Sequence, residues 1–136
     1  MNSDYYEKKT YKSFIIIFII MIASILLPIF TNNYFKLSSS VSIKLMFLIM
    51  NFSLIIISYI IYKKERVYWI TSYDYETACN MTSEERKSIG KKLFRSFRIC
   101  FGISTIYFFI SLIIGTSVLV DSIVFIVSVV AACIKA

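Results

Sequence analysis

The amino-acid sequence predicts an all-α integral membrane protein with four transmembrane helices in one domain, residues 1–136. Of its residues, 58% are hydrophobic and 17% are charged, whereas soluble domains are about 45–50% apolar and about 25% charged. The apolar residues fall in long blocks, as in membrane-spanning helices. This composition excludes a soluble enzyme, a secreted disulfide scaffold and a disordered tail.

The first apolar block, Phe14 to Phe30, predicts a transmembrane helix over residues 13–31. Thirteen of its 17 residues are Ile, Leu or Phe, which favours insertion by about 4–8 kcal/mol on a transfer scale. A cleaved signal peptide is the alternative, because Lys8, Lys9 and Lys12 precede the block. The block is longer than the core of about 7–15 residues in signal peptides, and no small-residue cleavage site follows.

Two further blocks predict the other three transmembrane helices. Leu45 to Tyr62 predicts a helix over 44–62. The stretch from Ile99 to Ile134 has 36 residues, and one helix of that length would span about 54 Å, which exceeds a bilayer core. It therefore predicts two helices, 99–117 and 120–135, and a turn marked by Gly115 to Ser122. A re-entrant hairpin that does not cross fully is the alternative.

The distribution of positive charge predicts the orientation. The net charge is +7, and only two of the 15 Lys and Arg residues, Lys36 and Lys44, fall in the loop between the first two helices. The other 13 fall before the first helix, in the 63–98 loop, and at Lys135. The positive-inside rule places these 13 in the cytoplasm, so both termini are predicted to be cytoplasmic and the protein to lie in the plasma membrane. The charge requires no nucleic-acid partner, and it also favours binding to anionic lipids of the inner leaflet.

The 63–98 loop is the predicted cytoplasmic segment. Tyr59, Tyr62, Arg66, Trp69 and Tyr73 recur every three to four residues, which predicts that the second helix continues for two or three turns beyond the membrane. Aromatic residues such as Tyr5 and Trp69 are expected interfacial anchors.

A second helix is predicted within this loop. Thr82 followed by Glu85 matches a capping box, so a helix should begin near residue 83. Ile89, Leu93 and Phe97 share its apolar side, and Arg86 falls unexpectedly near that side. The basic residues predicted to contact the membrane surface and anionic lipid, together with Trp69, are Lys87, Lys91, Arg95 and Arg98. We expect this amphipathic helix to lie in the headgroup region before the third transmembrane helix; a partner-binding helix is the alternative.

The loop resembles that of a family of small, uncharacterised multi-pass membrane proteins from low-GC Gram-positive bacteria. The matching stretches are Trp69-Ile70, Ser72-Tyr73-Asp74, Ser83-Glu84-Glu85-Arg86-Lys87 and Lys91-Lys92-Leu93. Ser72 and Asp74 replace the Gly and Asn of the family pattern, and residues 75–81 form an additional spacer. The resemblance covers about 25 of the 136 residues. It implies a bacterial membrane protein in the neighbourhood of bacteriocin- and toxin-immunity proteins, and it carries over no catalytic residue.

Polar residues within the apolar blocks are the candidate intramembrane contacts. Lys44, Asn51 and Ser58 are seven residues apart and share one helix face, and Asn51 is expected to form a hydrogen bond between helices. The third and fourth helices carry similar stripes. The candidate residues are Asn51, Ser58, Ser104, Ser111 and Ser128. Close helix packing and a polar path through a bundle or oligomer are the two interpretations; Asp121 is expected in the outer turn.

The sequence lacks the residue patterns of enzymes. It contains no His, and its three Cys residues have no metal-binding spacing. We therefore predict no catalytic residue, metal or cofactor. The favoured function is binding within the bilayer, as an immunity or accessory protein for a membrane-active toxin or a membrane complex. The partner would be a membrane protein or peptide, with a homo-oligomer as a further option. The alternatives are a pore-forming or holin-like effector and a small transport component.

Overall fold

The computed structural model describes residue 6 and residues 8–136, and it confirms the all-α prediction. Six α-helices and one short 3₁₀ helix account for the regular structure of this part of the chain. They are α1 (Lys12–Ile25), α2 (Leu27–Phe35), α3 (Ser39–Lys64), η1 (Val67–Trp69), α4 (Tyr75–Asn80), α5 (Ser83–Ile114) and α6 (Val118–Lys135).

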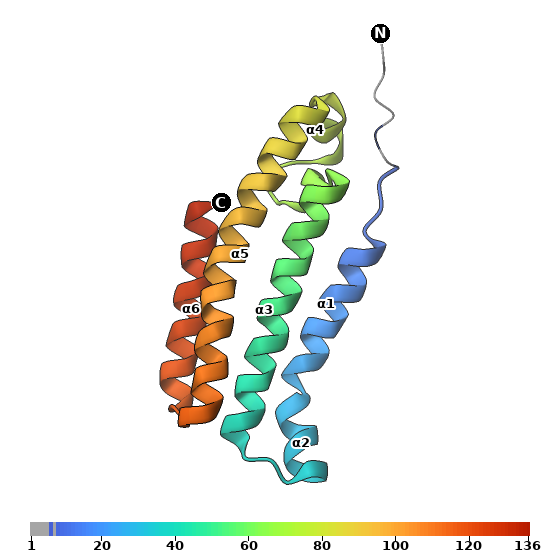
Figure 1. Ribbon diagram of the computed structural model, residues 1–136. Helices are drawn as coiled ribbons and strands as arrows, with labels where there is room; N and C mark the ends of the chain where they lie inside the picture. The colour runs from blue at the N-terminus through green and yellow to red at the C-terminus, as the bar shows by residue number, and fades with distance from the viewer. Residues whose placement is uncertain (1–5, 7) are drawn as a thin grey trace.

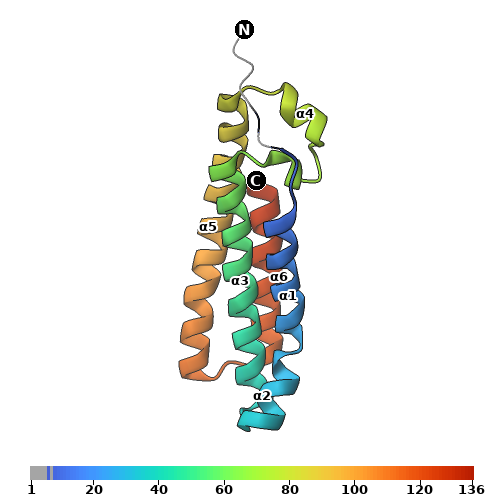
Figure 2. The same ribbon diagram turned by 90° about the vertical axis from the view of Figure 1, so that its right-hand side faces the viewer.

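The long helices lie side by side in the order α6, α5, α3 and α1 (Figure 1). The central pair, α3 and α5, packs along its length, while α1 and α2 pack on α3, and α6 packs mainly on α5. Residues 65–82, with α4, lie at one end of the molecule, which we call the loop end (Figures 1 and 2). The opposite end, with the α2–α3 and α5–α6 connections, is called the turn end.

Three helices, α3, α5 and α6, are long and apolar enough to cross a membrane. The α1–α2 pair passes the same test as one unit that bends by 51°. Pro28 lies in the first turn of α2, where its missing N–H and rigid ring are compatible with a new helix but not with the continuation of α1. The predicted single helix over 13–31 is therefore a bent pair.

The bent pair runs the length of α3. The Thr10 carbonyl oxygen, just before α1, accepts hydrogen bonds from Trp69 Nε1 at 3.0 Å and from the Tyr68 hydroxyl at 3.1 Å. At the other end, the Thr31 and Ser42 hydroxyls are hydrogen-bonded to each other. These contacts place the start of α1 at the loop end and α2 at the turn end.

The loop after α3 differs from the prediction. Helix α3 begins five residues earlier than expected and ends at Lys64, because Glu65 adopts a left-handed conformation with φ of 56°. The predicted continuation of this helix through Trp69 and Tyr73 is therefore wrong. The chain turns into η1 instead, and its aromatic side chains are buried against the start of α1, as in the contact between the Trp69 and Phe14 rings.

The capping box is confirmed, but the helix that it starts is longer than predicted. Thr82 Oγ1 accepts from the Glu85 amide at 3.2 Å, and Glu85 Oε2 accepts from the Thr82 amide at 2.8 Å. Helix α5 then continues without a break to Ile114. The predicted separate amphipathic helix, lying flat in the headgroup region, is wrong: it is the first half of the third long helix. Packing against α3 stabilises the additional turns of α5, because most of the stability of a helix comes from tertiary contacts and little from its intrinsic helix propensity.

The predicted turn near residue 115 is confirmed. Gly115 ends α5 with φ of 81°, a conformation that glycine adopts without steric cost. Helix α6 then returns alongside α5, and the Ser96 hydroxyl donates to the Ala132 carbonyl at 2.9 Å. The 18 residues of α6 span about 27 Å, which favours a full pass over a re-entrant hairpin.

Gly90 sets the distance between α5 and α3. A Cβ atom at Gly90 would lie 2.8 Å from the Tyr62 Cα, which is backbone and must shift to make room, whereas a Cβ at Gly102 would meet nothing within 4 Å. Gly90→Ala is therefore expected to destabilise the protein by about 1–3 kcal/mol through overpacking. Gly102→Ala, the matched control, should be neutral or stabilise the helix by up to about 1 kcal/mol. Thermal unfolding of both variants in mild detergent tests this, and equal effects would contradict the close approach.

Candidate functional site: a buried polar network

An ion pair links α3 to α6 at the turn end. Lys44 Nζ lies 2.7 Å from Asp121 Oδ2, and the two side chains are 1% and 0% exposed. The ammonium also donates to Ser40 Oγ at 3.0 Å and to the Thr116 carbonyl at 2.6 Å. All three donors of the Lys44 ammonium therefore have acceptors.

The second oxygen of the Asp121 carboxylate is equally well bonded. Oδ1 accepts from the hydroxyls of Tyr107 at 2.9 Å, Ser111 at 2.9 Å and Thr116 at 2.6 Å. The Ser111 and Thr116 hydroxyl oxygens also lie in direct contact with each other. Asp121 lies in the first turn of α6, where the helix dipole favours a negative charge.

The network has the properties of a structural lock. A buried ion pair is tolerated when hydrogen bonds satisfy the remaining donors and acceptors, and the loss of one partner then leaves an uncompensated charge. Here α3 contributes the cation and α6 the anion, while the end of α5 and the turn after it contribute the hydroxyl donors. The arrangement therefore holds the α5–α6 turn against α3.

Asn51 forms the predicted contact between helices. Its side chain is fully buried near the middle of α3, and Nδ2 donates to Ser104 Oγ of α5 at 3.1 Å. Thr105 Oγ1 lies at the limit of a hydrogen bond, 3.5 Å away. Asn51 Oδ1 has no donor among the described residues, so only part of the hydrogen-bonding capacity of the amide is used.

This incomplete pairing predicts a small effect for an apolar replacement. Asn51→Leu is expected to change the free energy of unfolding by less than about 1 kcal/mol, because it removes one interhelical bond and one unpaired acceptor together. Asn51→Asp should cost about 2.5–3.5 kcal/mol, the cost of a charge at the centre of a transmembrane helix. Unfolding in detergent with increasing SDS measures both variants; a large loss for Asn51→Leu would show that Asn51 carries more of the packing than these contacts indicate.

The other predicted intramembrane residues have different environments. Ser104 and Ser111 are buried and join the contacts described above. Ser58 is also fully buried, but its hydroxyl donates to the Ile55 carbonyl of its own helix at 2.7 Å. Ser128 is half-buried and bonds to the Val124 carbonyl at 2.8 Å. Ser58 and Ser128 therefore form no side-chain bond to another helix in the part of the chain that the structure describes.

Sequence reasoning missed the Lys44–Asp121 pair and the role of Thr116. Lys44 was expected at the boundary of the outer loop and the second helix, on the face of Asn51, and Asp121 was expected in the outer turn. The structure buries both inside helices. A signal was present: Asp121 is the only acidic residue between Ile99 and Lys135, and antiparallel helices bring it to the same end as Lys44. Opposite charges at the same depth favour pairing.

The predicted basic surface is only partly as expected. Lys87, Lys91, Arg95 and Arg98 are exposed along the loop-end half of α5. Trp69 is not a surface anchor: it is 9% exposed and is packed against Phe14. The predicted anchor Tyr5 lies outside the described residues.

Arg86, which the helix pattern placed near the apolar side, organises the loop end. It is 3% exposed, and its Nε lies 3.0 Å from Glu65 Oε2. Its Nη1 donates to the carbonyl oxygens of Ala78, at 3.1 Å, and Met81, and its guanidinium lies 4.1 Å from the centre of the Tyr6 ring. Arg86 therefore joins α3, α4, α5 and the segment before α1.

The electrostatics of Glu65 reflect this pairing. Burial raises the pKa of its carboxyl, but hydrogen bonds from Ser83 and Arg86 and the positive charges of Arg86 and Lys87 outweigh this effect. The pKa therefore lies below its ordinary value. Glu65 is charged at neutral pH and binds Arg86 as a carboxylate.

The described residues contain no group of three or more His, Cys, Asp or Glu side chains placed to hold a metal ion. The cysteines Cys79, Cys100 and Cys133 are free thiols. Comparisons with protein-family models, curated proteins and solved structures find no match to this chain.

Proposed function

We propose that this chain is a four-pass plasma-membrane protein that acts by binding a membrane protein or peptide within the bilayer. The observation that carries the proposal is the arrangement of the polar faces of α3 and α5, which pack against each other. Asn51 bonds to Ser104, and Lys44 and Ser111 both bond to Asp121. The polar groups thus serve to hold the helices together.

The outward surface is correspondingly apolar. Large hydrophobic side chains are exposed along α1 and α6, including Ile19, Ile22, Ile126 and Val127, each at least half exposed. Exposed apolar surface on this scale suits lipid tails or the helices of a partner. Three spans and a bent pair support four passes, and the charge distribution supports cytoplasmic termini.

An immunity or accessory role agrees with this surface and with the resemblance of the loop to small Gram-positive membrane proteins. A pore-forming or holin-like function is the second candidate. It would require Asn51, Ser104 and Ser111 to leave their mutual contacts and to line water in an oligomer. The buried positions of these three residues favour the binding function.

Inducible expression in a bacterium, with a membrane-potential dye, separates these functions. The binding function predicts normal membrane potential and growth at high expression. In the same cells, it predicts increased survival against a membrane-active bacteriocin, and the Asp121→Asn variant should lose that protection. Rapid depolarisation on expression, abolished by Ser111→Ala, would contradict the binding function and support a pore.

A further inference from the structure

A basic groove lies between α5 and the end of α6 at the loop end. It has a volume of about 370 Å³ and is lined by Lys92, Arg95, Ser96, Ile99 and Lys135. The two helices are held together beside it by the hydrogen bond from Ser96 to the Ala132 carbonyl, at 2.9 Å. Three cationic side chains from two helices thus converge on one hollow.

The cations of this groove lack acidic partners. No carboxylate of the described residues forms an ion pair with Lys92, Arg95 or Lys135, whereas Lys44, Arg86 and Lys87 each have an acidic partner. Uncompensated like charges repel each other, so a bound anion would stabilise their arrangement. Lysine and arginine side chains are the usual protein ligands of phosphate groups.

A stripe of exposed apolar side chains, the apolar track, follows the cations along α5 toward the turn end. Ile99, Ile103, Ile106 and Ile110 follow Arg95 at intervals of three or four residues along α5, and they are 42–65% exposed. On α6, Ile134 precedes Lys135 and is 79% exposed. A ligand with one anionic group and long apolar chains fits this combination, whereas a soluble phosphate would leave the track unused.

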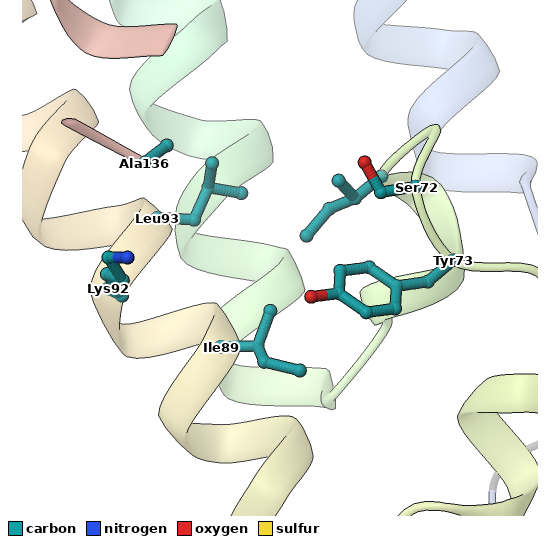
Figure 3. Close-up of a pocket in the computed structure, with 7 residues that line it drawn as sticks. Ser72, Tyr73, Ile89, Lys92, Leu93 and Ala136 are labelled. Carbon is teal, nitrogen blue, oxygen red and sulfur yellow. The ribbon is translucent and has the colours of Figure 1, made fainter. Parts of the chain in front are cut away.

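A second hollow lies on the loop side of the groove. Lys92 is shared with a hollow of about 260 Å³, lined by Ile70, Tyr73, Ile89 and Leu93 among others. Figure 3 shows the Tyr73 hydroxyl directed into this hollow, toward Ile89 and Leu93. The hydroxyl provides a hydrogen-bonding group in the hollow that Lys92 also lines.

We infer that the groove is a binding site for one anionic phospholipid, whose phosphate contacts Lys92, Arg95 and Lys135 and whose chains lie along α5. Basic pockets between transmembrane helices on the cytoplasmic side bind anionic headgroups in this way. The inference rests on the membrane-spanning part of the proposed function, but it does not depend on the partner. It goes beyond general attraction to an anionic leaflet, because it assigns one site with a defined stoichiometry.

Native mass spectrometry of the full chain, released from detergent with phosphatidylglycerol and phosphatidylcholine in equal amounts, tests the site. We expect one phosphatidylglycerol adduct per chain to be favoured over phosphatidylcholine by about fivefold or more. The Lys92→Gln/Lys135→Gln variant should lose most of this preference. The control, Lys63→Gln/Lys64→Gln, removes the same charge from exposed residues at the end of α3 and should retain it.

Three results would overturn the inference: no preference for phosphatidylglycerol, an equal loss in both variants, or displacement of the lipid by millimolar glycerol 3-phosphate. The second would indicate general surface charge, and the third a soluble phosphate ligand. Helix content by circular dichroism shows whether the variants fold. Alkaline extraction of membranes tests insertion separately, so that failure of the four-pass proposal is distinguished from failure of the lipid site.

Discussion

Asp121→Asn is expected to lower the free energy of unfolding by about 3–5 kcal/mol, because it leaves the buried Lys44 ammonium without its counter-ion. Lys44 has no exposed route to water, since its side chain is 1% exposed. The Asn side chain retains some hydrogen bonding to Tyr107 and Ser111, so the loss is mainly electrostatic. Lys44→Met should have a comparable effect, because it leaves a buried carboxylate unpaired.

The double variant Lys44→Met/Asp121→Leu should be less destabilised than either single variant. Replacement of a buried ion pair by apolar residues is often neutral or stabilising, and a double-mutant cycle measures the coupling directly. Chemical unfolding in detergent, followed by circular dichroism, gives the three values. Ser128→Ala is the control, because the Ser128 hydroxyl bonds to the Val124 carbonyl of its own helix and to no other helix among the described residues. Additive effects of the two single changes would contradict the lock at the turn end.

Arg86→Met is expected to destabilise the protein by about 3 kcal/mol, the lower part of the range for breaking a buried ion pair. The change leaves the carbonyl oxygens of Ala78 and Met81 without the Arg86 donor, and it leaves Glu65 with only Ser83 and the exposed Lys87. Lys87→Met is the matched control: Lys87 Nζ lies 3.5 Å from the same Glu65, but Lys87 is 60% exposed. An exposed ion pair contributes about 0–1 kcal/mol.

The fluorescence of Trp69 reports on this change without a label. Trp69 is the only tryptophan in the chain, and it is packed at the loop end against Phe14. Arg86→Met should shift its emission to longer wavelength, since the loop loosens and water reaches the indole. The Lys87→Met emission should match that of the unmodified protein. An unchanged spectrum in Arg86→Met would show that the loop is held by its aromatic contacts alone.

Much of the architecture follows from local sequence patterns. The apolar blocks predicted the long helices, Gly115 predicted the turn between the last two, and Thr82 with Glu85 predicted the start of α5. Each of these signals acts over a few residues. Asn51 was also identified in advance, because an amide in the middle of an apolar helix needs a partner from another helix.

The features that were missed depend on contacts between distant segments. Lys44 and Asp121 are 77 residues apart, and their pairing depends on the relative register of α3 and α6. Tryptophan is a residue type typical of interfacial anchors. The left-handed conformation of Glu65, however, redirects the chain so that Trp69 packs against the start of α1. The bend between α1 and α2 follows from Pro28, yet the sequence does not show which preceding residue ends α1. Tertiary packing decides these outcomes.

Thiol labelling of single-cysteine variants in intact cells tests the four-pass orientation most directly. Cys79 is exposed at the loop end, and Lys36→Cys places a thiol at the turn end; the remaining cysteines are replaced by Ser. With both termini in the cytoplasm, a membrane-impermeant maleimide should label Lys36→Cys in intact cells and should label Cys79 only after the cells are permeabilised. Labelling of Cys79 in intact cells, or equal labelling of both positions, would contradict this orientation.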